Sequence, residues 1–438
     1  MLGRVKENLK SALPWLARFV WWMKRRITEL SALHRHLIRR IRQRDNRIHN
    51  EGVIKVVFLC QYIPAWSKNK QLYETLKSDR RFETCLLCVP NRISANQLRE
   101  PDDQSNDTYE YFCGQGYSDA VNALIGKNEW LDLKSWHPDY VICNRYDRPM
   151  PIPYTSGELS KYMKICFITY SGVALLERDE VAFDKHFMAN TFCFFAESEG
   201  KEREYYRCNK ILGALKLCRA VRCGSPAVEN MVKAKNDKGH AWDFSENGFR
   251  AIYAPRWTQD PTWGGSSFLE YGNSLIHFAD EHSDLDLLIR PHPLMFDHFV
   301  DTAVMTEKEV ADFAQQCDFR KNVKLDTEKE YHSTFWNSSA LICDFSSIIV
   351  EYYVTEKPII YLTFDEKIGY TEQMLAMLSG CYIVHSKAEL EQTIEQLLAG
   401  RDPLAQRRSE VCRKYLAVDN NATTSEKMKQ ALIDGYSK

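Results

Sequence analysis

The chain has 438 residues, of which 44% are apolar and 27% charged, so it is long enough for two domains with full hydrophobic cores. Its net charge is only −1, so the overall charge gives no reason to expect binding to nucleic acid. The 14 cysteines lie mostly in apolar runs, which is typical of buried thiols in a reducing compartment. Cys85 and Cys88 have C-x-x-C spacing, but no second pair follows, so the sequence predicts no metal site and no cofactor, and Mg²⁺ is not indicated.

The first 50 residues form a basic, amphipathic segment. They hold 13 Lys or Arg and 3 Asp or Glu, an excess of ten positive charges, so the remaining 388 residues carry a net charge of −11. Apolar residues recur at steps of three or four, the period of one helical face, and Pro14 is expected to break or restart the helix. Basic residues lie on the opposite face, and Trp15, Trp21 and Trp22 suit a headgroup boundary. This pattern is typical of a helix lying on an anionic membrane surface.

Two other interpretations of this segment stay open: a helix packed on the body of the protein or on another subunit, and a nucleic-acid-binding arm, which the Trp-rich stripe disfavours. The apolar stretch over residues 15–23 is too short to span a bilayer, and Arg18 interrupts it with no cleavage site after it. The sequence therefore predicts a membrane-associating arm over residues 1–50, on a protein that is bound peripherally at the cytoplasmic face of the membrane.

From residue 51 onward, short β-branched runs alternate with helical periods, as in βαβ units with a parallel sheet. The alternation predicts an α/β fold with two doubly wound, Rossmann-like domains, over residues 51–240 and 241–395, followed by helices over 396–438. Two such domains facing each other place a ligand crevice at the carboxyl ends of their strands. Functional residues are therefore expected directly after strands.

Polar residues follow two predicted strands of the second domain. Arg290 and His292 come directly after LDLLI, where Pro291 and Pro293 stiffen the strand exit, and the two side chains can neutralise a pyrophosphate. Asp344 directly follows the strand-like run SSALIC. Ser346 and Ser347 open the next helix, whose N–H groups can hold a phosphate. An ordinary helix cap explains the serines as well, and a structural histidine is the alternative for His292.

Two further candidates lie at predicted strand ends. Arg256 follows RAIYAP and can hold a phosphate or form a surface ion pair. Ser225 precedes Pro226 at a helix start, where capping explains it fully and a substrate role is secondary. The chain has no G-x-S-x-G, H-E-x-x-H or Walker A motif and no G-x-G-x-x-G after its first strand, which disfavours hydrolases, zinc proteases, kinases and simple dehydrogenases.

In this order, IYAPRW, RPHP and CDFSSIIVEYYVTEKPIIYL resemble motifs of the CDP-glycerol glycerophosphotransferase family, which includes teichoic acid primases and polymerases and related capsule polymerases. The resemblance covers about residues 250–365. It implies a GT-B-like fold, with the CDP donor on the second domain and the acceptor on the first. Site residues are assigned by matching family motifs: Arg290 and His292 to a basic-x-His-Pro element, Asp344, Ser346 and Ser347 to an Asp-aromatic-Ser-Ser element, and Arg256 to the Tyr-Ala-Pro element, where members often have Thr.

The implied reaction is attack by a hydroxyl of a membrane-linked or cell-surface polymer on the distal phosphorus of CDP-glycerol or CDP-ribitol, with release of CMP. His292 and Asp344 are the implied catalytic residues. Many members carry a His-Gly pair in the first domain as the proposed base, but this chain has none that Thr-Pro follows. The run ICFITYSGVALLE takes that place, and His186 is the substitute. A GT-B glycosyltransferase that uses a nucleotide sugar, and a membrane-bound scaffold without activity, are the alternatives.

Overall fold

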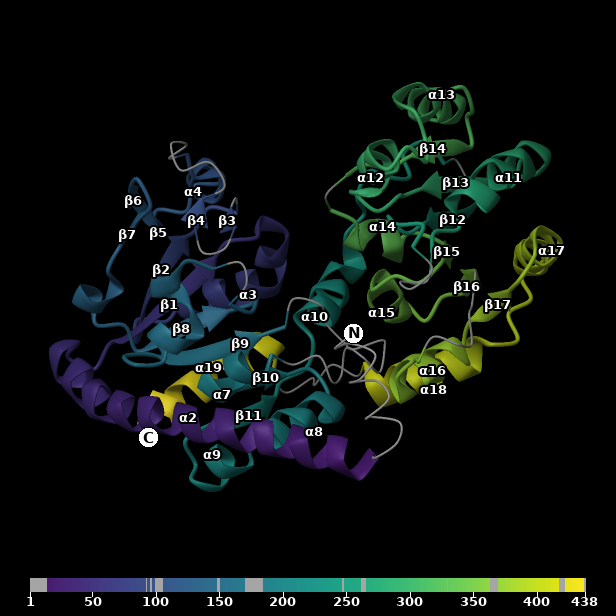
Figure 1. The fold of residues 1–438 in the computed structure, drawn as a ribbon. Helices are drawn as coiled ribbons and strands as arrows, with labels where there is room; N and C mark the ends of the chain where they lie inside the picture. Colours follow the sequence, from purple (N-terminus) through teal and green to yellow (C-terminus); the bar gives the residue numbers. More distant parts are fainter. Residues whose placement is uncertain are drawn as a thin grey trace, which may run out of the picture. The chain divides into compact units, whose positions relative to one another are not determined.

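The computed structural model describes most of the chain, and its described residues fall into two compact units. Unit 1 comprises Met1–Gly172, Glu180–Pro226 and Asn420–Lys438, and unit 2 comprises Val173–Asp179 and Ala227–Asp419. Each unit has a parallel sheet with helices on both faces (Figure 1), which confirms the predicted α/β fold class. The described residues are 14–91, 93–94, 97–98, 105–147, 150–169, 184–245, 248–260, 265–328, 330–362, 369–416 and 422–436.

Unit 1 is built on a seven-stranded sheet with the order β11-β10-β9-β8-β1-β2-β5, in which neighbouring strands pair in parallel. Its strands are β1 (Ile54–Cys60), β2 (Phe82–Cys88), β5 (Ala120–Asn122), β8 (Tyr140–Cys143), β9 (Lys164–Ile168), β10 (Thr191–Ala196) and β11 (Arg219–Arg222). Two antiparallel pairs stand beside it, β3 (Ile93–Ser94) with β4 (Gln97–Leu98) and β6 (Leu124–Gly126) with β7 (Glu129–Trp130).

Alternate residues of the unit 1 strands enter two different cores, because successive side chains of a strand point to opposite faces. In β1, Val57 and Leu59 enter one core, while Val56 and Phe58 enter the other. Since both faces are covered, the strands read as continuous apolar runs. The first core is covered by α2 (Pro14–His49), α5 (Ser156–Leu159), α7 (Lys185–Asn190), α8 (Glu199–Cys208) and α9 (Lys210–Ala214), and the second by α3 (Trp66–Lys77), α4 (Asp107–Gly114) and α19 (Thr424–Tyr436).

The last helix, α19, belongs to unit 1 although the sequence between it and β11 builds unit 2. It packs against α3 and covers the amino ends of β8 and β9. The Tyr140 hydroxyl donates a hydrogen bond to the Leu432 carbonyl at 2.7 Å, and the Lys164 ammonium donates one to the Gly435 carbonyl at 2.6 Å. Unit 1 is therefore completed by residues from the far end of the chain.

Unit 2 is built on a six-stranded parallel sheet with the order β14-β13-β12-β15-β16-β17. Numbered along the unit, this order is 3-2-1-4-5-6, the Rossmann arrangement, and its direction reverses between β12 and β15. The strands are β12 (Phe249–Ala254), β13 (Leu285–Ile289), β14 (Val323–Leu325), β15 (Ala340–Cys343), β16 (Ile359–Leu362) and β17 (Tyr382–Val384).

The helices of unit 2 also cover both faces of its sheet. One core receives α10 (Pro226–Lys233), α14 (His332–Trp336), α15 (Ile348–Tyr353), α16 (Glu372–Leu378) and α18 (Ala405–Tyr415). The other receives α11 (Phe268–Glu281), α12 (Met295–Asp301), α13 (Glu307–Asp318) and α17 (Lys387–Leu398). Unit 2 also has a short 3-10 turn at Ala234–Asn236, and unit 1 has three, at Ile63–Ala65, Leu133–Trp136 and Ile152–Tyr154.

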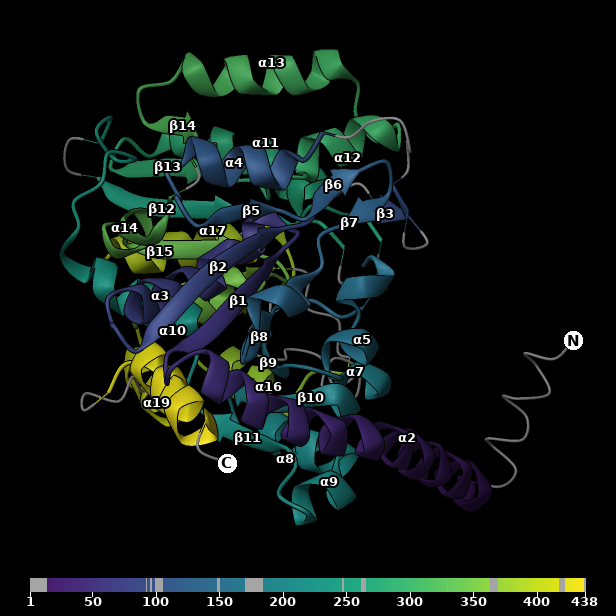
Figure 2. The ribbon, with the colours of Figure 1, turned by 90° about the vertical axis from the view of Figure 1, so that its left-hand side faces the viewer.

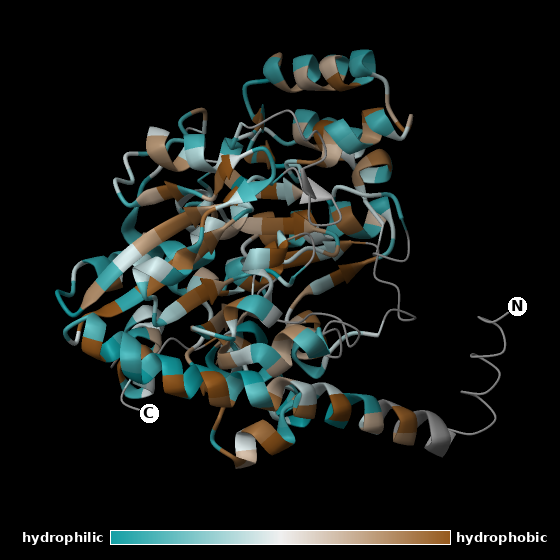
Figure 3. Ribbon diagram, turned by 60° about the vertical axis from the view of Figure 1, so that its left-hand side comes forward, coloured by the Kyte–Doolittle hydropathy of each residue, from teal (hydrophilic) through white to brown (hydrophobic). Residues whose placement is uncertain are grey.

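Helix α2 packs on unit 1 through polar side chains and exposes apolar ones, the reverse of an ordinary surface helix. It lies along α7 and α9 (Figure 2), and brown apolar positions alternate with teal polar ones along it (Figure 3). The buried polar side chains recur at helical spacing: Arg25, Glu29, His36, Arg39, Gln43 and Asn46. The exposed apolar ones are Phe19, Val20, Trp22, Met23, Ile27, Leu30, Leu37, Ile38, Ile41 and Ile48. In the structure, Pro14–His49 of the predicted arm therefore pack on the body of unit 1.

The buried polar side chains of α2 bind side-chain and backbone groups of unit 1. Arg25 forms an ion pair with Glu204 at 2.8 Å, and Glu29 accepts a hydrogen bond from the Leu212 N–H at 2.6 Å. His36 Nε2 donates to the Ala189 carbonyl at 2.7 Å. Because these three side chains have specific partners, the position of α2 is fixed more narrowly than by apolar contact alone. Among the described helices, none combines the length and the apolar character that crossing a bilayer requires.

Candidate active site

Three loops that carry predicted site residues begin at the carboxyl ends of β13, β12 and β15, which are neighbours in the unit 2 sheet. Backbone hydrogen bonds join the first two of them, from the Arg290 N–H to the Tyr253 carbonyl at 2.7 Å and from the His292 N–H to the Pro255 carbonyl at 3.2 Å. The site lies where the strand order reverses, the position at which open α/β sheets bind their ligands.

Asp344 is the buried centre of this site. Its side chain is fully buried, and Oδ2 accepts hydrogen bonds from the Arg256 N–H at 3.1 Å, the Ser267 N–H at 2.8 Å and the Ser267 hydroxyl at 2.8 Å. Burial raises the pKa of this carboxyl from 3.8 to about 6, although the bonds to Ser267 and Arg256 oppose the shift. The carboxylate thus ties the loop after β12 and the start of α11 to the end of β15.

Arg256 lies beside the same loop. Its Nη1 donates a hydrogen bond to the Phe345 carbonyl at 2.6 Å, and its guanidinium carbon stands 4.9 Å from the centre of the Phe345 ring. The backbone N–H of Arg256 binds Asp344, so both ends of the residue are anchored. The positive charge is held next to the loop that begins with Asp344.

His292 presents an exposed imidazole at the end of β13. Its Nδ1 accepts a hydrogen bond from the Leu294 N–H at 3.2 Å, which leaves Nε2 as the nitrogen that carries the proton in the neutral ring. The Trp257 ring lies 6.4 Å away. Desolvation, and to a smaller extent the charge of Arg256, lowers the pKa of His292. The neutral ring can therefore donate one hydrogen bond, from Nε2, to a ligand.

Arg290, by contrast, is bound within the protein. Its guanidinium forms an ion pair with Asp326, donates to the Glu328 carbonyl at 2.6 Å and stands 5.0 Å from the centre of the Tyr331 ring. These contacts anchor the end of β13 to the end of β14. A direct phosphate contact by Arg290 stays a prediction, and the geometry favours a positioning role for it.

Ser346 and Ser347 stand at the start of α15. Ser347 is exposed, and its side chain makes no capping hydrogen bond. The Ser346 hydroxyl accepts only a long contact of 3.5 Å from the Ile348 N–H. Because capping does not occupy these hydroxyls strongly, both are able to bind a ligand.

The predicted candidates of the first domain lie in unit 1. His186 opens α7, and its Nδ1 lies 3.6 Å from Oδ2 of Asp147, which follows the carboxyl end of β8. The interaction with Asp147 raises the pKa of His186, whose side chain is 57% exposed. Ser225 lies between β11 and α10. The run ICFITYSGVALLE lies outside the described residues from residue 170 onward.

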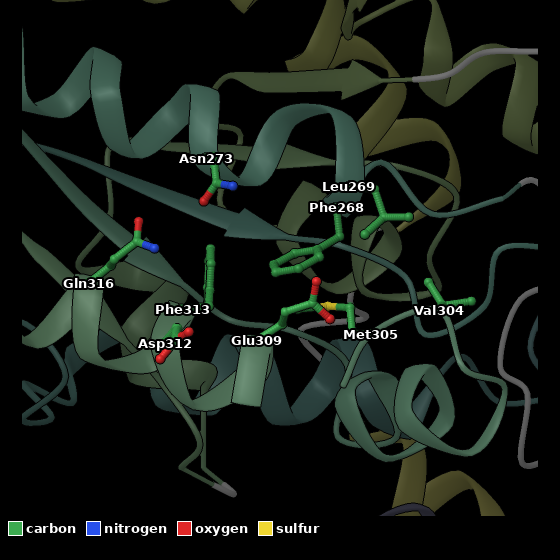
Figure 4. A pocket seen from close by; sticks show the side chains of 9 residues that line it. All are labelled: Phe268, Leu269, Asn273, Val304, Met305, Glu309, Asp312, Phe313 and Gln316. Atoms are coloured by element: carbon green, nitrogen blue, oxygen red, sulfur yellow. The ribbon is translucent and has the colours of Figure 1, made fainter. Parts of the chain in front are cut away.

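A cavity of about 320 Å³ elsewhere in unit 2 lies between α11 and α13 (Figure 4). Phe268 and Phe313 lie within it, and Glu309 and Asp312 add carboxylates along α13. The predicted site residues are absent from its described lining. Its acidic wall is a poor match for a nucleotide phosphate, so the strand-end site remains the candidate.

Sequence reasoning missed three residues that organise these sites: Ser267, Asp326 and Asp147. Each forms a hydrogen bond or ion pair with a predicted site residue and belongs to none of the recognised motifs. Each also lies far along the chain from the residue that it holds. Asp326 is the partial exception, because it directly follows the predicted strand NVKLD, where strand-end logic could have found it.

Asp344→Ala is expected to destabilise unit 2 by about 3 kcal/mol, because the two N–H donors and the hydroxyl lose their buried acceptor. Asp344→Asn keeps an acceptor oxygen and should stay within about 1 kcal/mol of the parent at pH 5. Because the folded pKa is raised, the contribution of the carboxyl is fully present below pH 3.8 and is lost as pH rises through about 6.

Urea unfolding at pH 5 and pH 7.5 checks this prediction. The stability of the parent relative to Asp344→Asn should fall between the two pH values. A difference that does not depend on pH would show that the carboxyl is not held in a desolvated site.

The two Rossmann-type units define a GT-B-like fold, and in unit 2 polar residues stand at the carboxyl ends of neighbouring strands. The chain belongs to the CDP-glycerol:poly(glycerophosphate) glycerophosphotransferase family, whose sequence profile matches residues 215–433, half of the chain. The predicted family and the predicted class of enzyme, a CDP-glycerol glycerophosphotransferase-like transferase, are therefore confirmed.

Solved structures show the same fold. The wall teichoic acid polymerase TagF is 13% identical, with a TM-score of 0.57 over 95% of this chain and 98% of that one. UDP-GlcNAc 2-epimerase from Neisseria meningitidis, solved with UDP-GlcNAc bound, is 13% identical, with a TM-score of 0.56 over 88% of this chain and 100% of that one. No curated protein sequence matches the chain.

Proposed function

We propose that the protein transfers glycerol phosphate from CDP-glycerol to a hydroxyl of a teichoic-acid-type polymer and releases CMP. Membership of the family supports the donor, and a structure of TagF has been determined after a soak with CDPG. The observation that carries the proposal is the meeting of Arg256, His292 and Ser346 at the ends of three neighbouring strands, where the sheet order reverses. CDP-ribitol is the alternative donor of the same class.

In this proposal, an acceptor oxygen forms a bond to the distal phosphorus while the bond from that phosphorus to the bridging oxygen breaks. The leaving CMP takes the electron pair. His292 Nε2–H donates to the oxygen on which charge develops, and Arg256 and the two serines hold the phosphates. Asp344 is enclosed by protein and acts by holding the Arg256 loop, so its catalytic assignment becomes a positioning role.

The acceptor hydroxyl has to lose a proton, and His186 is the proposed base. The Asp147 carboxylate, 3.6 Å away, raises the pKa of the imidazole. It therefore favours the protonated ring that forms when His186 accepts a proton from the acceptor. This histidine–carboxylate pair is the feature of unit 1 that resembles an acid–base device.

Purified protein incubated with CDP-glycerol, CDP-ribitol or a UDP-sugar, each with a glycerol-phosphate-primed acceptor, tests the function. Acceptor-dependent release of CMP from CDP-glycerol is the expected result. Release of UDP would favour the glycosyltransferase alternative. Binding of none of these nucleotides would favour the scaffold.

We also propose that α2 attaches the protein to the cytoplasmic face of the membrane. Its outward apolar side chains have no cover among the described residues, and Lys24, Arg40, Arg42 and Arg44 are exposed beside them. An apolar stripe flanked by basic side chains is typical of helices that lie at a lipid headgroup boundary.

Ile27→Ser with Ile41→Ser is expected to weaken binding to phosphatidylglycerol vesicles at least tenfold, because these side chains are 60% and 70% exposed and would insert into lipid. Ile125→Ser with Ile152→Ser is the matched control, since those isoleucines are 61% and 62% exposed elsewhere on unit 1. Vesicle sedimentation measures both. Equal binding by the two double variants would contradict the proposal, and loss of a dimer in the first would assign the stripe to a second copy of the chain.

A further inference from the structure

A second cavity of about 320 Å³ lies in unit 1, and five cationic side chains line it. They are Arg39 and Arg40 of α2, Lys164 of β9, Lys216, and Arg219 of β11. The described lining contains no carboxylate. Lys164 and Arg219 are the first residues of their strands, so the cavity lies at the amino ends of the sheet. His186 and Asp147 are absent from the described lining, and the cavity is therefore separate from the candidate base.

Arg39 and Lys164 are the buried cations of this cavity, and Arg39 and Arg219 are incompletely hydrogen-bonded. Arg39 is 1% exposed, and its Nη2 donates to Nδ1 of His36 at 2.9 Å. Within the described part of the chain, Nε and Nη1 of Arg39 have no hydrogen-bond partner, and neither has Nε of Arg219. Because a buried donor without a partner is costly, these atoms indicate a missing acceptor.

The same charges also repel one another. Lys164, Arg39 and Arg219 surround the ring of Phe192, at 4.8, 5.4 and 5.6 Å from its centre. Burial, and then Arg39 and Arg47, lowers the pKa of Lys164 to about 7, while Asp139 is the carboxylate that opposes this shift. A bound anion would restore the charge balance that the protein leaves open.

The mouth of the cavity combines charge with apolar surface. Arg40 and Lys216 are exposed there, and so are the adjacent Ile41 and Leu215. A doubly charged oxyanion with several acceptor oxygens matches a cluster of Arg and Lys donors better than a monovalent ion does.

We propose that this cavity is a binding site for a phosphate group, carried by an anionic phospholipid headgroup or free in solution. The site uses no residue of the candidate active site, so it does not depend on the transferase activity. If the phosphate belongs to a lipid, the cavity would fix the orientation of α2 on the membrane, a contribution that is separate from its apolar stripe.

Arg40→Ala with Lys216→Ala tests the site, because both side chains are exposed and their loss should not unfold the protein. Arg80→Ala with Lys210→Ala is the matched control: it removes the same charges from exposed positions outside both the cavity and α2, in the turn before β2 and at the start of α9. Titration calorimetry of the full chain with inorganic phosphate, against sodium chloride of equal ionic strength, gives the first measurement. Sedimentation with phosphatidylglycerol vesicles gives the second.

The expected result is at least a tenfold loss of binding in Arg40→Ala with Lys216→Ala, and a change within twofold in the control. A loss seen with inorganic phosphate identifies a site for free phosphate, and a loss seen with vesicles alone identifies a headgroup site. Equal losses in the two double variants, or no binding of either probe by the parent, would overturn the proposal.

Discussion

His292→Ala is expected to lower the rate of glycerol-phosphate transfer by about a hundredfold or more, which corresponds to about 3 kcal/mol of lost transition-state stabilisation. The imidazole is exposed at a strand end, and Leu294 N–H holds its Nδ1, so Nε2–H is directed to a ligand rather than to the core. The loss should appear in kcat more than in KM, because the hydrogen bond strengthens only as charge develops on the leaving group.

His277→Ala is the control, since this histidine is exposed on α11 and its Nδ1 lies 4.0 Å from Oδ2 of Asp280, outside the candidate site. It should transfer at the parental rate, and both variants should unfold at the parental temperature. Transfer by His292→Ala within threefold of the parent would remove His292 from the mechanism, since that change is worth less than about 1 kcal/mol.

Deletion of residues 1–48 is expected to abolish the cooperative folding of unit 1. The deletion removes one ion-pair partner of Glu204 and the hydrogen-bond partners of the Leu212 N–H and the Ala189 carbonyl, and it uncovers the core into which Ala32 packs. The lost hydrogen bonds are worth about 1 kcal/mol each, and the lost burial adds to them. An ordinary domain is stabilised by only about 5 to 15 kcal/mol, so these losses together remove a large part of the stability of unit 1.

Limited proteolysis followed by mass spectrometry measures this effect. Fragments of unit 1 should disappear first, while Ala227–Asp419 resists cleavage. Ile27→Ser with Ile41→Ser keeps the buried face of α2 and should digest like the parent. A truncated protein with a protease-resistant unit 1 would show that α2 is an accessory arm after all.

The fold was predictable from the sequence because its strands are buried on both faces. Continuous apolar runs such as KVVFLC and LDLLI indicate buried strands in a chain that alternates them with helical periods. In the structure, β1 and β13 form at those runs. The orientation of α2 was not predictable in the same way. Periodicity identifies two faces of a helix, but it does not say which face is buried when the body offers polar partners such as Glu204.

The candidate site was predictable only in part. Strand-end logic identified Arg256, His292 and Asp344, because the carboxyl ends of β12, β13 and β15 are neighbours. It could not distinguish residues whose side chains face a ligand from residues that hold those side chains in position. Asp344 and Arg290 are bound by Ser267 and Asp326, and these pairings depend on a register that only the folded sheet defines.

The return of α19 to unit 1 has a consequence for the biosynthesis of the protein. Lys164 and its acceptor on Gly435 are separated by 271 residues, so at roughly 5 to 20 residues per second a ribosome needs about 14 to 54 seconds between them. During that interval the nascent unit 1 lacks the helix that covers Tyr140 and the second core, whereas the main segment of unit 2, Ala227–Asp419, is continuous. We expect this segment to fold first on the ribosome, and the uncovered face of unit 1 to be a substrate for chaperones until α19 has been synthesised.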